Sequence, residues 1–262
     1  MPILSIITIN YNNSRGLQKT MQSVFSQSFK DFEYIVVDGG STDESIATLQ
    51  QYENKLAFWV AEKDKGIYDA MNKGIEKAAG QYILFLNSGD WLVDENVLQY
   101  FNEAAIKTAA DIYYGNILLE TAGHSVSLHQ YPAELTLDFW ESYTINHQAS
   151  FIKRLLFKEL GLYDGDYPLA ADYAFFIKCF INGKTFEFIN KELVHYVLDG
   201  ASSKNESEYQ QQRQLAWDTI IPAQVHQLFK ENKAHQSLMR HRLMRMAERF
   251  QMQYNRLKKI FK

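Results

Sequence analysis

The stretch FLNSGDWL, at residues 85–92, breaks an apolar run with four polar or turn-forming residues. Asn87, Ser88, Gly89 and Asp90 carry oxygen atoms of the kind that Mg²⁺ and Mn²⁺ bind in proteins. Mg²⁺ needs only one or two carboxylates when phosphates and water complete its coordination, so a single Asp is enough. The same four residue types also build ordinary turns. The stretch therefore predicts either a turn or a divalent-cation site with Asp90 as its acid.

A second acid, Asp38, ends the apolar run IVVD and is followed by Gly39 and Gly40. The next residues, 41–44, are explained as the capped and acidic start of a helix. This explanation does not account for Asp38, which lies before them. A carboxylate at a strand end can accept hydrogen bonds from a nucleobase or a ribose. Neither GxGxxG nor GxxxxGK[ST] occurs, so the dinucleotide fingerprint and the P-loop are absent from the sequence.

The elements that position these residues alternate through the first hundred residues. Short apolar runs at 4–10, 32–40, 56–62 and 82–88 predict strands, and the stretches 16–28, 42–53 and 68–80 between them predict helices. This order predicts an α/β fold, in which helices cover both faces of a mostly parallel, doubly wound sheet. Ligands bind such sheets at the carboxyl ends of the strands, where Asn10, Tyr11, Asp38 and residues 87–90 lie.

The second half is less regular. The pattern predicts a strand at 110–120, a strand leading into a helix over 144–161, a helix at 169–183 and an extended segment at 186–199. From Ser207 onward only Pro222 interrupts a helical pattern. We therefore expect a domain boundary near Lys204, with a main domain at 1–204 and a helical C-terminal tail at 205–262.

The composition is that of a globular protein, with 46% hydrophobic residues among 262. Cys179 is the single cysteine, which excludes an intramolecular disulfide framework and favours a reducing compartment. The apolar N-terminus is too short to span a bilayer and lacks the basic flank of a signal peptide. These features favour a cytoplasmic protein.

The tail differs in charge from the rest of the chain. Residues 235–262 carry a net charge of +7. The whole chain carries −4, so the remainder carries −11. Apolar residues recur there at spacings of three and four, from Met239 to Phe261, and Arg and Lys flank them. This basic amphipathic helix is suited to the inner, anionic face of a cell membrane, and we favour that surface over a homodimer contact. Because the remainder is acidic and no known binding module is present, nucleic acid is not an expected partner.

Four stretches together resemble the inverting family 2 glycosyltransferases, which are nucleotide-sugar enzymes of the GT-A fold. They are SIITINYNN, QSVFSQSFKDFEYIVVDGGSTD, EKDKGIYDAMNKGIEKAAGQYILFLNSGD and HQASFIKRLLFKELGLYDGDYPLAADYAFFIK, within residues 2–200. The resemblance implies a nucleotide-sugar-binding half at 1–100 and an acceptor half at 101–204. It also implies sugar transfer from a nucleotide-diphospho-sugar, taken here as a UDP-sugar, to a hydroxyl group. The acceptor would be a glycan or lipid-linked molecule in cell-surface glycan or polysaccharide synthesis.

The resemblance also implies donor-binding residues. Thr8, Asn10 and Tyr11 would line the nucleotide pocket, and Asp38 would contact the uracil or ribose. The helix that carries Asn72 would close the site.

This helix departs from the family at one position. Many relatives have an Arg immediately before the Asn, where it pairs with the diphosphate, but this chain has Met71. Lys65 or Lys73 is then expected to supply the charge.

The family's fourth strand ends in an Asp-x-Asp-Asp motif that holds a divalent cation between the donor phosphates. Residues 87–90 align with it, and only Asp90 keeps the acid. The resemblance therefore implies that Asp90 binds Mn²⁺ or Mg²⁺, while Asn87 adds a carbonyl ligand or contacts the ribose. We expect Asp90 to matter to catalysis far more than Asn87.

By the same resemblance, Asp172 is the base that removes the acceptor proton. It can also simply cap its helix, and the residue before it is Ala171 where relatives often have Glu. An apolar setting is expected to raise its pKa. Asp164 and Asp166 rank second because they lie in a turn-like segment.

Two histidines complete the candidate site. His147 is expected near the acceptor, and His195 near the metal or diphosphate, although a lone histidine is more often structural. Two other functions stay open. A nucleotidyltransferase shares the sheet, but NYNNSRG matches its Gly-rich signature poorly. A catalytically degenerate nucleotide-sugar-binding or scaffold protein is favoured by the reduced acidic motif.

Overall fold

The computed structural model describes residues 1–121, 125–198 and 205–234. Its strands are β1 (Leu4–Asn10), β2 (Phe32–Asp38), β3 (Phe58–Ala61), β4 (Tyr82–Phe85), β5 (Trp91–Leu92), β6 (Ile112–Glu120), β7 (Val126–His129), β8 (Ser150–Lys153) and β9 (Phe186–Val197). Its α-helices are α1 (Ser14–Phe25), α2 (Ser45–Tyr52), α3 (Ile67–Lys77), α4 (Val97–Lys107), α5 (Leu137–Ser142), α6 (Leu155–Leu160), α7 (Ala171–Ile181) and α9 (Glu206–Ile220). Short 3₁₀ helices occupy Glu53–Lys55 and His147–Ala149.

A single sheet runs in the order β3-β2-β1-β4-β8-β6-β9-β5, and β7 adds to β6. The first four strands are parallel, and their register pairs Asn10 directly with Asp38. Strand β8 then runs antiparallel to both β4 and β6. The carboxyl ends of β1, β2 and β4 consequently share one edge, as in other doubly wound sheets.

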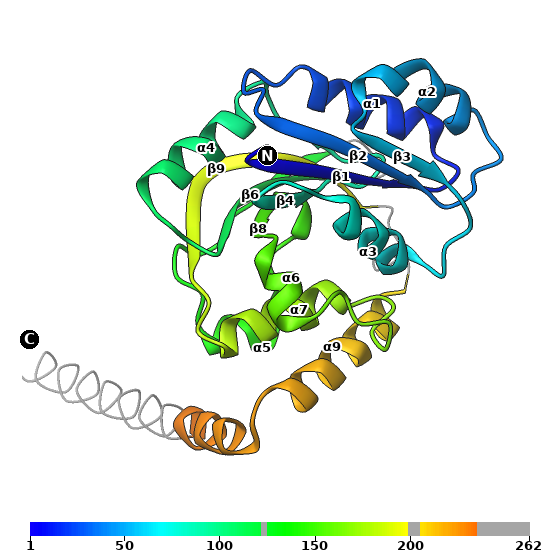
Figure 1. Cartoon of the computed structure of the whole chain (residues 1–262). Coiled ribbons are helices and arrows are strands. Elements are labelled where there is room, and N and C mark those ends of the chain that lie inside the picture. The colour runs from blue at the N-terminus through cyan, green and yellow to red at the C-terminus, as the bar shows by residue number, and fades with distance from the viewer. Residues whose placement is uncertain (122–124, 199–204, 235–262) are drawn as a thin grey trace, which may run out of the picture. The chain divides into compact units, whose positions relative to one another are not determined.

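Helices cover both faces of this sheet (Figure 1). Helices α1 and α2 lie on one face, while α3, α6 and α7 lie on the other. All seven residues of β1 and all four of β4 are buried, because strands covered on both sides contact water on neither. The predicted α/β fold with helices on both faces is confirmed.

The predicted elements of the first half occur at the expected places, and so do β6, β8, α6, α7 and β9. The sequence analysis missed β5, α4, β7 and α5. Helix α4 did carry a signal, since Val97, Leu98 and Phe101 are spaced for one buried helix face. Strands β5 and β7 have two and four residues, which is too short for a periodicity to be recognised.

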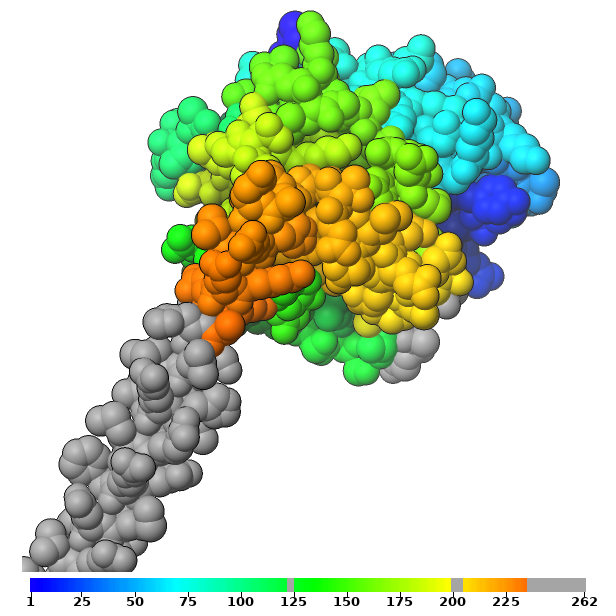
Figure 2. Space-filling view, turned by 90° about the horizontal axis from the view of Figure 1, so that it is seen from below, coloured from blue at the N-terminus to red at the C-terminus, as the bar shows by residue number. Residues whose placement is uncertain are grey.

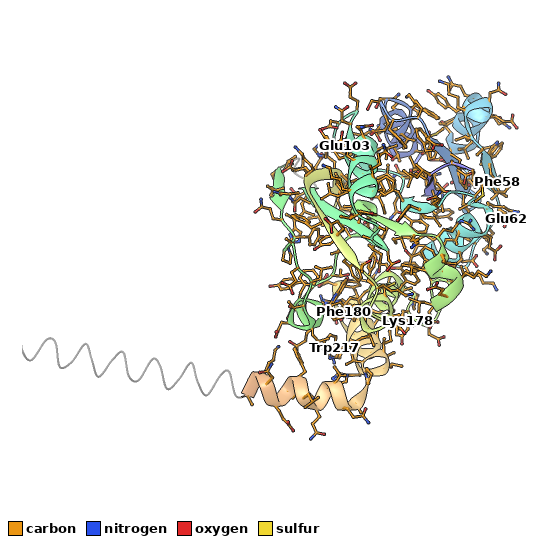
Figure 3. All side chains as sticks on the ribbon, turned by 60° about the vertical axis from the view of Figure 1, so that its left-hand side comes forward. Phe58, Glu62, Glu103, Lys178, Phe180 and Trp217 are labelled. Carbon is orange, nitrogen blue, oxygen red and sulfur yellow. The ribbon has the colours of Figure 1, made fainter. Side chains whose placement is uncertain are left out.

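The compact unit that contains the sheet runs from Met1 to Ile220 and therefore includes α9. Helix α9 packs against α7, with Ala216 and Trp217 buried. Figure 3 shows Trp217 close to the end of α7 that carries Lys178 and Phe180. The boundary expected at Lys204 falls before this helix, whereas the contacts place α9 in the same unit as the sheet.

The second unit begins at Ile221, and residues 223–234 in it are helical. The apolar stripe from Met239 to Phe261, on which the membrane and homodimer predictions rest, lies outside the described residues. Within the described part of the chain, no helix is both long enough and apolar enough to cross a bilayer.

Gly80 lies in the loop between α3 and β4, which approaches β1 closely. A Cβ atom there would lie 2.5 Å from the backbone nitrogen of Ser5, which cannot move without shifting the strand. We expect Gly80→Ala to lower the free energy of unfolding by about 1–3 kcal/mol, measured by urea denaturation. Gly165→Ala is the matched control, because an added Cβ there meets none of the described atoms within 4 Å. Equal stability of the two variants would contradict the close approach.

Candidate functional site

Two cavities meet at the carboxyl ends of β1, β2 and β4. The large cavity, of about 980 Å³, lies beside the ends of β1 and β2 and the start of α3. The small cavity, of about 320 Å³, lies between the ends of β4 and β9, the 144–148 segment, α7 and α9. Ile67, Asn87 and Ser88 line both cavities. The end of β4 thus forms the boundary between two adjoining spaces.

The loop after β4 is fixed by hydrogen bonds to α1. Asn13 caps α1 by accepting from Gly16 N, and its Nδ2 donates to Ser88 O at 3.0 Å. Gly89 N donates to Thr20 Oγ1, which in turn donates to Asp90 O at 2.7 Å. Gly89 has φ +108°, a conformation that favours glycine. The loop is therefore a turn, as its composition predicts, but one held firmly against the cavities.

Asp90 is 5% exposed and lines the small cavity. Its carboxylate accepts from Gln148 Nε2 at 3.2 Å and from the backbone N of Val197 at 3.0 Å. Asn87 lies at the boundary of the cavities, and its buried Oδ1 has no hydrogen-bond partner among the described residues. Asn87 and Asp90 both line the small cavity, and amide and carboxylate oxygens suit a hard cation.

The described residues do not form a closed metal site of His, Cys, Asp and Glu ligands. In the part of the chain that the structure describes, no three His, Cys, Asp or Glu residues are grouped so that they could hold a metal ion. Asn87 and Asp90 instead fit an open site, which needs few protein ligands because phosphate oxygens and water supply the others.

Asp172 lies in the first turn of α7 and lines the small cavity, with its side chain 13% exposed. Its Oδ1 accepts from Tyr68 OH at 2.7 Å and from its neighbour Tyr173 N at 2.8 Å. Its Oδ2 lies 2.7 Å from Nδ1 of His147. A carboxylate offers about four lone-pair positions, and these contacts use three of them. One position remains for a ligand in the cavity.

The expectation that the surroundings raise the pKa of Asp172 is wrong. Burial acts in that direction, but the hydrogen bond from His147 and the electrostatic attraction of its ring oppose it, together with the Tyr68 hydroxyl. The net effect holds the pKa of Asp172 below its ordinary value of 3.8. The carboxylate is thus kept ionised by its partners.

His147 links the carboxylate to the boundary between the cavities. It is 6% exposed, and its second ring nitrogen, Nε2, lies 3.2 Å from Nδ2 of Asn87. Because an ionised carboxylate only accepts, Nδ1 carries the proton that is donated to Asp172. The histidine expected near the acceptor therefore lies in a hydrogen-bonded chain from Asn87 to Asp172.

Two predicted donor residues lie beneath the large cavity and do not line it. Asp38 is fully buried, and its carboxylate accepts from Gly40 N, Ser41 N, Ser41 Oγ and Asn10 Nδ2. Thr8 is also fully buried and is hydrogen-bonded to Tyr34 OH. Asp38 therefore shapes the loop after β2, while the backbone of that loop forms the cavity wall.

Tyr11 and Asn10 do line the large cavity. Tyr11 is 67% exposed, so the face of its ring is accessible. Asn10 is 5% exposed and its Oδ1 has no hydrogen-bond partner among the described residues.

The residues of helix α3 that were expected at the donor site do not line the large cavity. Asn72 exchanges two hydrogen bonds with the backbone of Tyr163, at 2.9 and 3.0 Å, and Met71 is fully buried. Lys73 pairs with Glu62 at 2.9 Å. None of these, nor Lys65, lines the large cavity.

Sequence reasoning missed Lys63 and Asp64, which do line the large cavity. Asp64 caps the following turn by accepting from Gly66 N, and Gly39 leaves room for its carboxylate next to Tyr11. The only signal was their charge at the end of a predicted strand. Lys63 is the single Lys or Arg among the described residues that line this cavity.

His195 lines neither cavity. Its ring stacks on Trp91 with centroids 4.5 Å apart, and Lys19 lies over the same Trp91 ring. Burial lowers the pKa of His195. The structural interpretation of this histidine is favoured over the metal or diphosphate role.

The sequence matches the family described as Glycosyl transferase family 2 over residues 5–160. An uncharacterized glycosyltransferase of Mycobacterium tuberculosis (strain ATCC 25618 / H37Rv) is 36% identical over 179 residues, which cover 68% of each protein. A "PGL/p-HBAD biosynthesis glycosyltransferase" of Mycobacterium bovis (strain BCG / Pasteur 1173P2) is 32% identical over 189 residues, covering 69% of this chain and 71% of the relative.

Two solved structures resemble the fold. Staphylococcus aureus TarS 1-349 in complex with UDP has a TM-score of 0.66 at 18% identity, over 85% of this chain and 68% of TarS 1-349. The mannosyltransferase PcManGT of Pyrobaculum calidifontis, in complex with GDP-Man and Mn²⁺, has a TM-score of 0.61 at 16% identity. The match covers 78% of this chain and 59% of PcManGT. The fold is thus the α/β architecture called GT-A. The chain belongs to glycosyltransferase family 2, which sets aside the nucleotidyltransferase alternative.

The pKa of Asp172 tests the role of His147 in this site. Burial raises the pKa of Asp172, and His147 is the partner that lowers it most. We therefore expect His147→Leu to raise the pKa of Asp172 from below 3.8 to above it. The ¹³C shift of the carboxyl group, assigned with Asp172→Asn, measures this pKa. His129→Leu is the control, since His129 lines the same cavity but is not among the groups that shift the pKa of Asp172. An unchanged midpoint in His147→Leu would show that other contacts keep the carboxylate ionised.

Proposed function

We propose that this glycosyltransferase is an inverting enzyme, which transfers a sugar from a UDP-sugar to a hydroxyl group in glycan synthesis. The observation that carries the proposal is the position of Asp172. Its ionised carboxylate lines the small cavity, and the chain through His147 and Asn87 connects it with the large cavity. The similar proteins support the reaction class and the donor: one is a biosynthesis glycosyltransferase, and TarS was solved with UDP.

The large cavity is the proposed donor site. The exposed ring of Tyr11 offers a flat face to the nucleobase, and the backbone of Gly39 and Gly40 leaves room for the ribose. Asn10 adds an unpaired carbonyl oxygen. Lys63 replaces the expected Lys65 or Lys73 as the cation for the diphosphate. Asp38 acts indirectly, by holding Asn10 and Gly40 in the wall of this cavity, whereas Thr8 and Asn72 bond Tyr34 and Tyr163, which line neither cavity.

The small cavity is the proposed acceptor site. The acceptor oxygen attacks the anomeric carbon while the bond from that carbon to the diphosphate oxygen breaks. Asp172 takes the hydroxyl proton at its remaining lone-pair position. Tyr68 and His147 hold the carboxylate in orientation, and a single displacement inverts the anomeric centre.

A divalent cation is proposed as the cofactor, held by the Asp90 carboxylate and the Asn87 carbonyl. When bound, Mn²⁺ or Mg²⁺ would neutralise the charge that builds up on the leaving diphosphate. The Mn²⁺ in the description of PcManGT supports this proposal. Asp90 contributes the only ligand charge from the loop after β4.

Asp172→Asn tests the base. A thermal-shift screen of UDP-glucose, UDP-galactose and UDP-N-acetylglucosamine with Mn²⁺ first selects the donor, and release of UDP then measures turnover. We expect the variant to lose about 10²- to 10⁴-fold in rate, because the amide cannot accept the proton, with unchanged affinity for UDP. Asp166→Asn is the control, since Asp166 is exposed and lines neither cavity.

Two results of this experiment would change the assignment. Undiminished turnover in Asp172→Asn would remove Asp172 as the base. A wild-type protein that binds UDP but turns over none of the donors would favour the catalytically degenerate, nucleotide-sugar-binding alternative.

Calorimetry of UDP with and without Mn²⁺ tests the cation site. In the wild type we expect Mn²⁺ to increase the affinity for UDP. Asp90→Asn should abolish that increase, because it removes the ligand charge but keeps the shape of the side chain. Asn87→Ala should only reduce it, since a neutral ligand is lost. An equal Mn²⁺ effect in the wild type and Asp90→Asn would end the assignment of Asp90 as a metal ligand.

A further inference from the structure

Helix α9 supplies a wall of the small cavity, through Glu206 and Tyr209. It lies beyond residue 160, where the match to the family ends. The match to the family model therefore says nothing about this wall. Figure 2 shows the gold side chains of α9 beside green side chains of the second half of the sheet unit.

Helix α9 is held rigidly next to Asp172. Arg213 is 7% exposed, donates to the carbonyl oxygens of Ser142 and Tyr143, and lies 4.5 Å from the ring centroid of Tyr173, the neighbour of Asp172. Gln212 accepts from Leu169 N at 2.7 Å, in the loop that leads into α7. These contacts fix Glu206 and Tyr209 relative to the proposed base.

The charge of the small cavity selects against anions. Apart from Asp90, which is assigned to the cation, its described lining residues include two carboxylates, on Asp172 and Glu206, and no Lys or Arg. Burial lowers the pKa of His129 and so favours its uncharged ring. The described lining of the large cavity includes one cation, Lys63, together with one carboxylate, on Asp64. A phosphate or carboxylate group on the acceptor would meet like charges here.

The rest of the lining combines flat apolar surfaces with neutral polar groups. Tyr196 and Tyr209 contribute rings, and Ile117 and Leu119 contribute an aliphatic wall from β6. Asn146 and Gln148 contribute amides, of which Gln148 is 3% exposed. A pyranose ring has the matching chemistry, because its C–H face is apolar while its hydroxyl groups donate and accept hydrogen bonds.

We propose that α9 restricts the acceptor site to an uncharged saccharide unit, with Tyr209 against the sugar ring and Glu206 excluding anionic acceptors. This inference rests on the proposed function, because it takes the small cavity as the acceptor site. It names the acceptor class as a neutral glycoside and excludes a sugar phosphate or a lipid phosphate in this cavity.

Saturation-transfer NMR on the full chain tests the inference, with UDP and the diamagnetic cation Mg²⁺ at saturating concentration to fill the large cavity. The neutral probes are the methyl glycosides of glucose, galactose, mannose, rhamnose and N-acetylglucosamine. The anionic probes are glucose 6-phosphate, mannose 6-phosphate and decyl phosphate. We expect at least one neutral glycoside to bind and no anionic probe to bind.

Variants of α9 then identify the residues responsible. Tyr209→Ala should weaken the binding of the neutral glycoside by roughly tenfold, while Tyr209→Phe keeps the ring and the binding. Glu206→Lys should allow a phosphorylated probe to bind. Glu208→Lys is the matched control, because it makes the same charge change on the same helix at a residue that does not line the cavity.

The outcomes separate this inference from the proposed function. Calorimetric binding of UDP without any binding of a neutral glycoside would overturn the inference and leave the donor site intact. Equal binding of phosphorylated and neutral probes to the wild type would overturn it as well, as would an unchanged affinity in Tyr209→Ala. If UDP itself does not bind, the proposed function fails first.

Discussion

The parallel pairing of β1 with β2 and β4 is the constraint on which the site depends. It brings Asn10, Asp38 and the loop after β4 to one edge of the sheet, although they are far apart in sequence. The antiparallel strand β8 then directs His147 and Gln148, which immediately precede it, back toward the same edge. Two adjoining cavities result, and Asn87 is among the residues that line both of them.

The α/β order and the strand ends could be predicted from the sequence, because hydrophobic periodicity and strand-end polarity are local signals. The roles of individual strand-end residues were harder. Asp38 has the right position for a ligand, yet four hydrogen bonds from its own loop and from Asn10 occupy its carboxylate. Asn72 is used in the same way by the backbone of Tyr163. A residue's position can be inferred from a pattern, but its partners depend on side chains elsewhere in the chain.

The same reason explains the error about Asp172. Its apolar neighbours in the sequence favour a raised pKa, and burial does act that way. The lowering comes from His147 and Tyr68, which lie on other elements and are separated from it by 25 and 104 residues. The sequence also did not predict that α9 lines the small cavity, because the pattern around Glu206 and Tyr209 indicates only a helix. Lys63 was overlooked because only its position in space distinguishes it from the neighbouring lysines.

The position of Asn87 has a thermodynamic consequence. Its amide lines both cavities and contacts Nε2 of His147, whose other nitrogen contacts Asp172. A ligand in the large cavity that reorients this amide therefore changes the hydrogen bond that orients the carboxylate in the small cavity. Linkage requires the converse effect to be equal, so the two substrates alter each other's affinity by the same factor. Because this coupling is mutual, it favours neither substrate as the first to bind, and a single side chain is enough to link the two halves of the site.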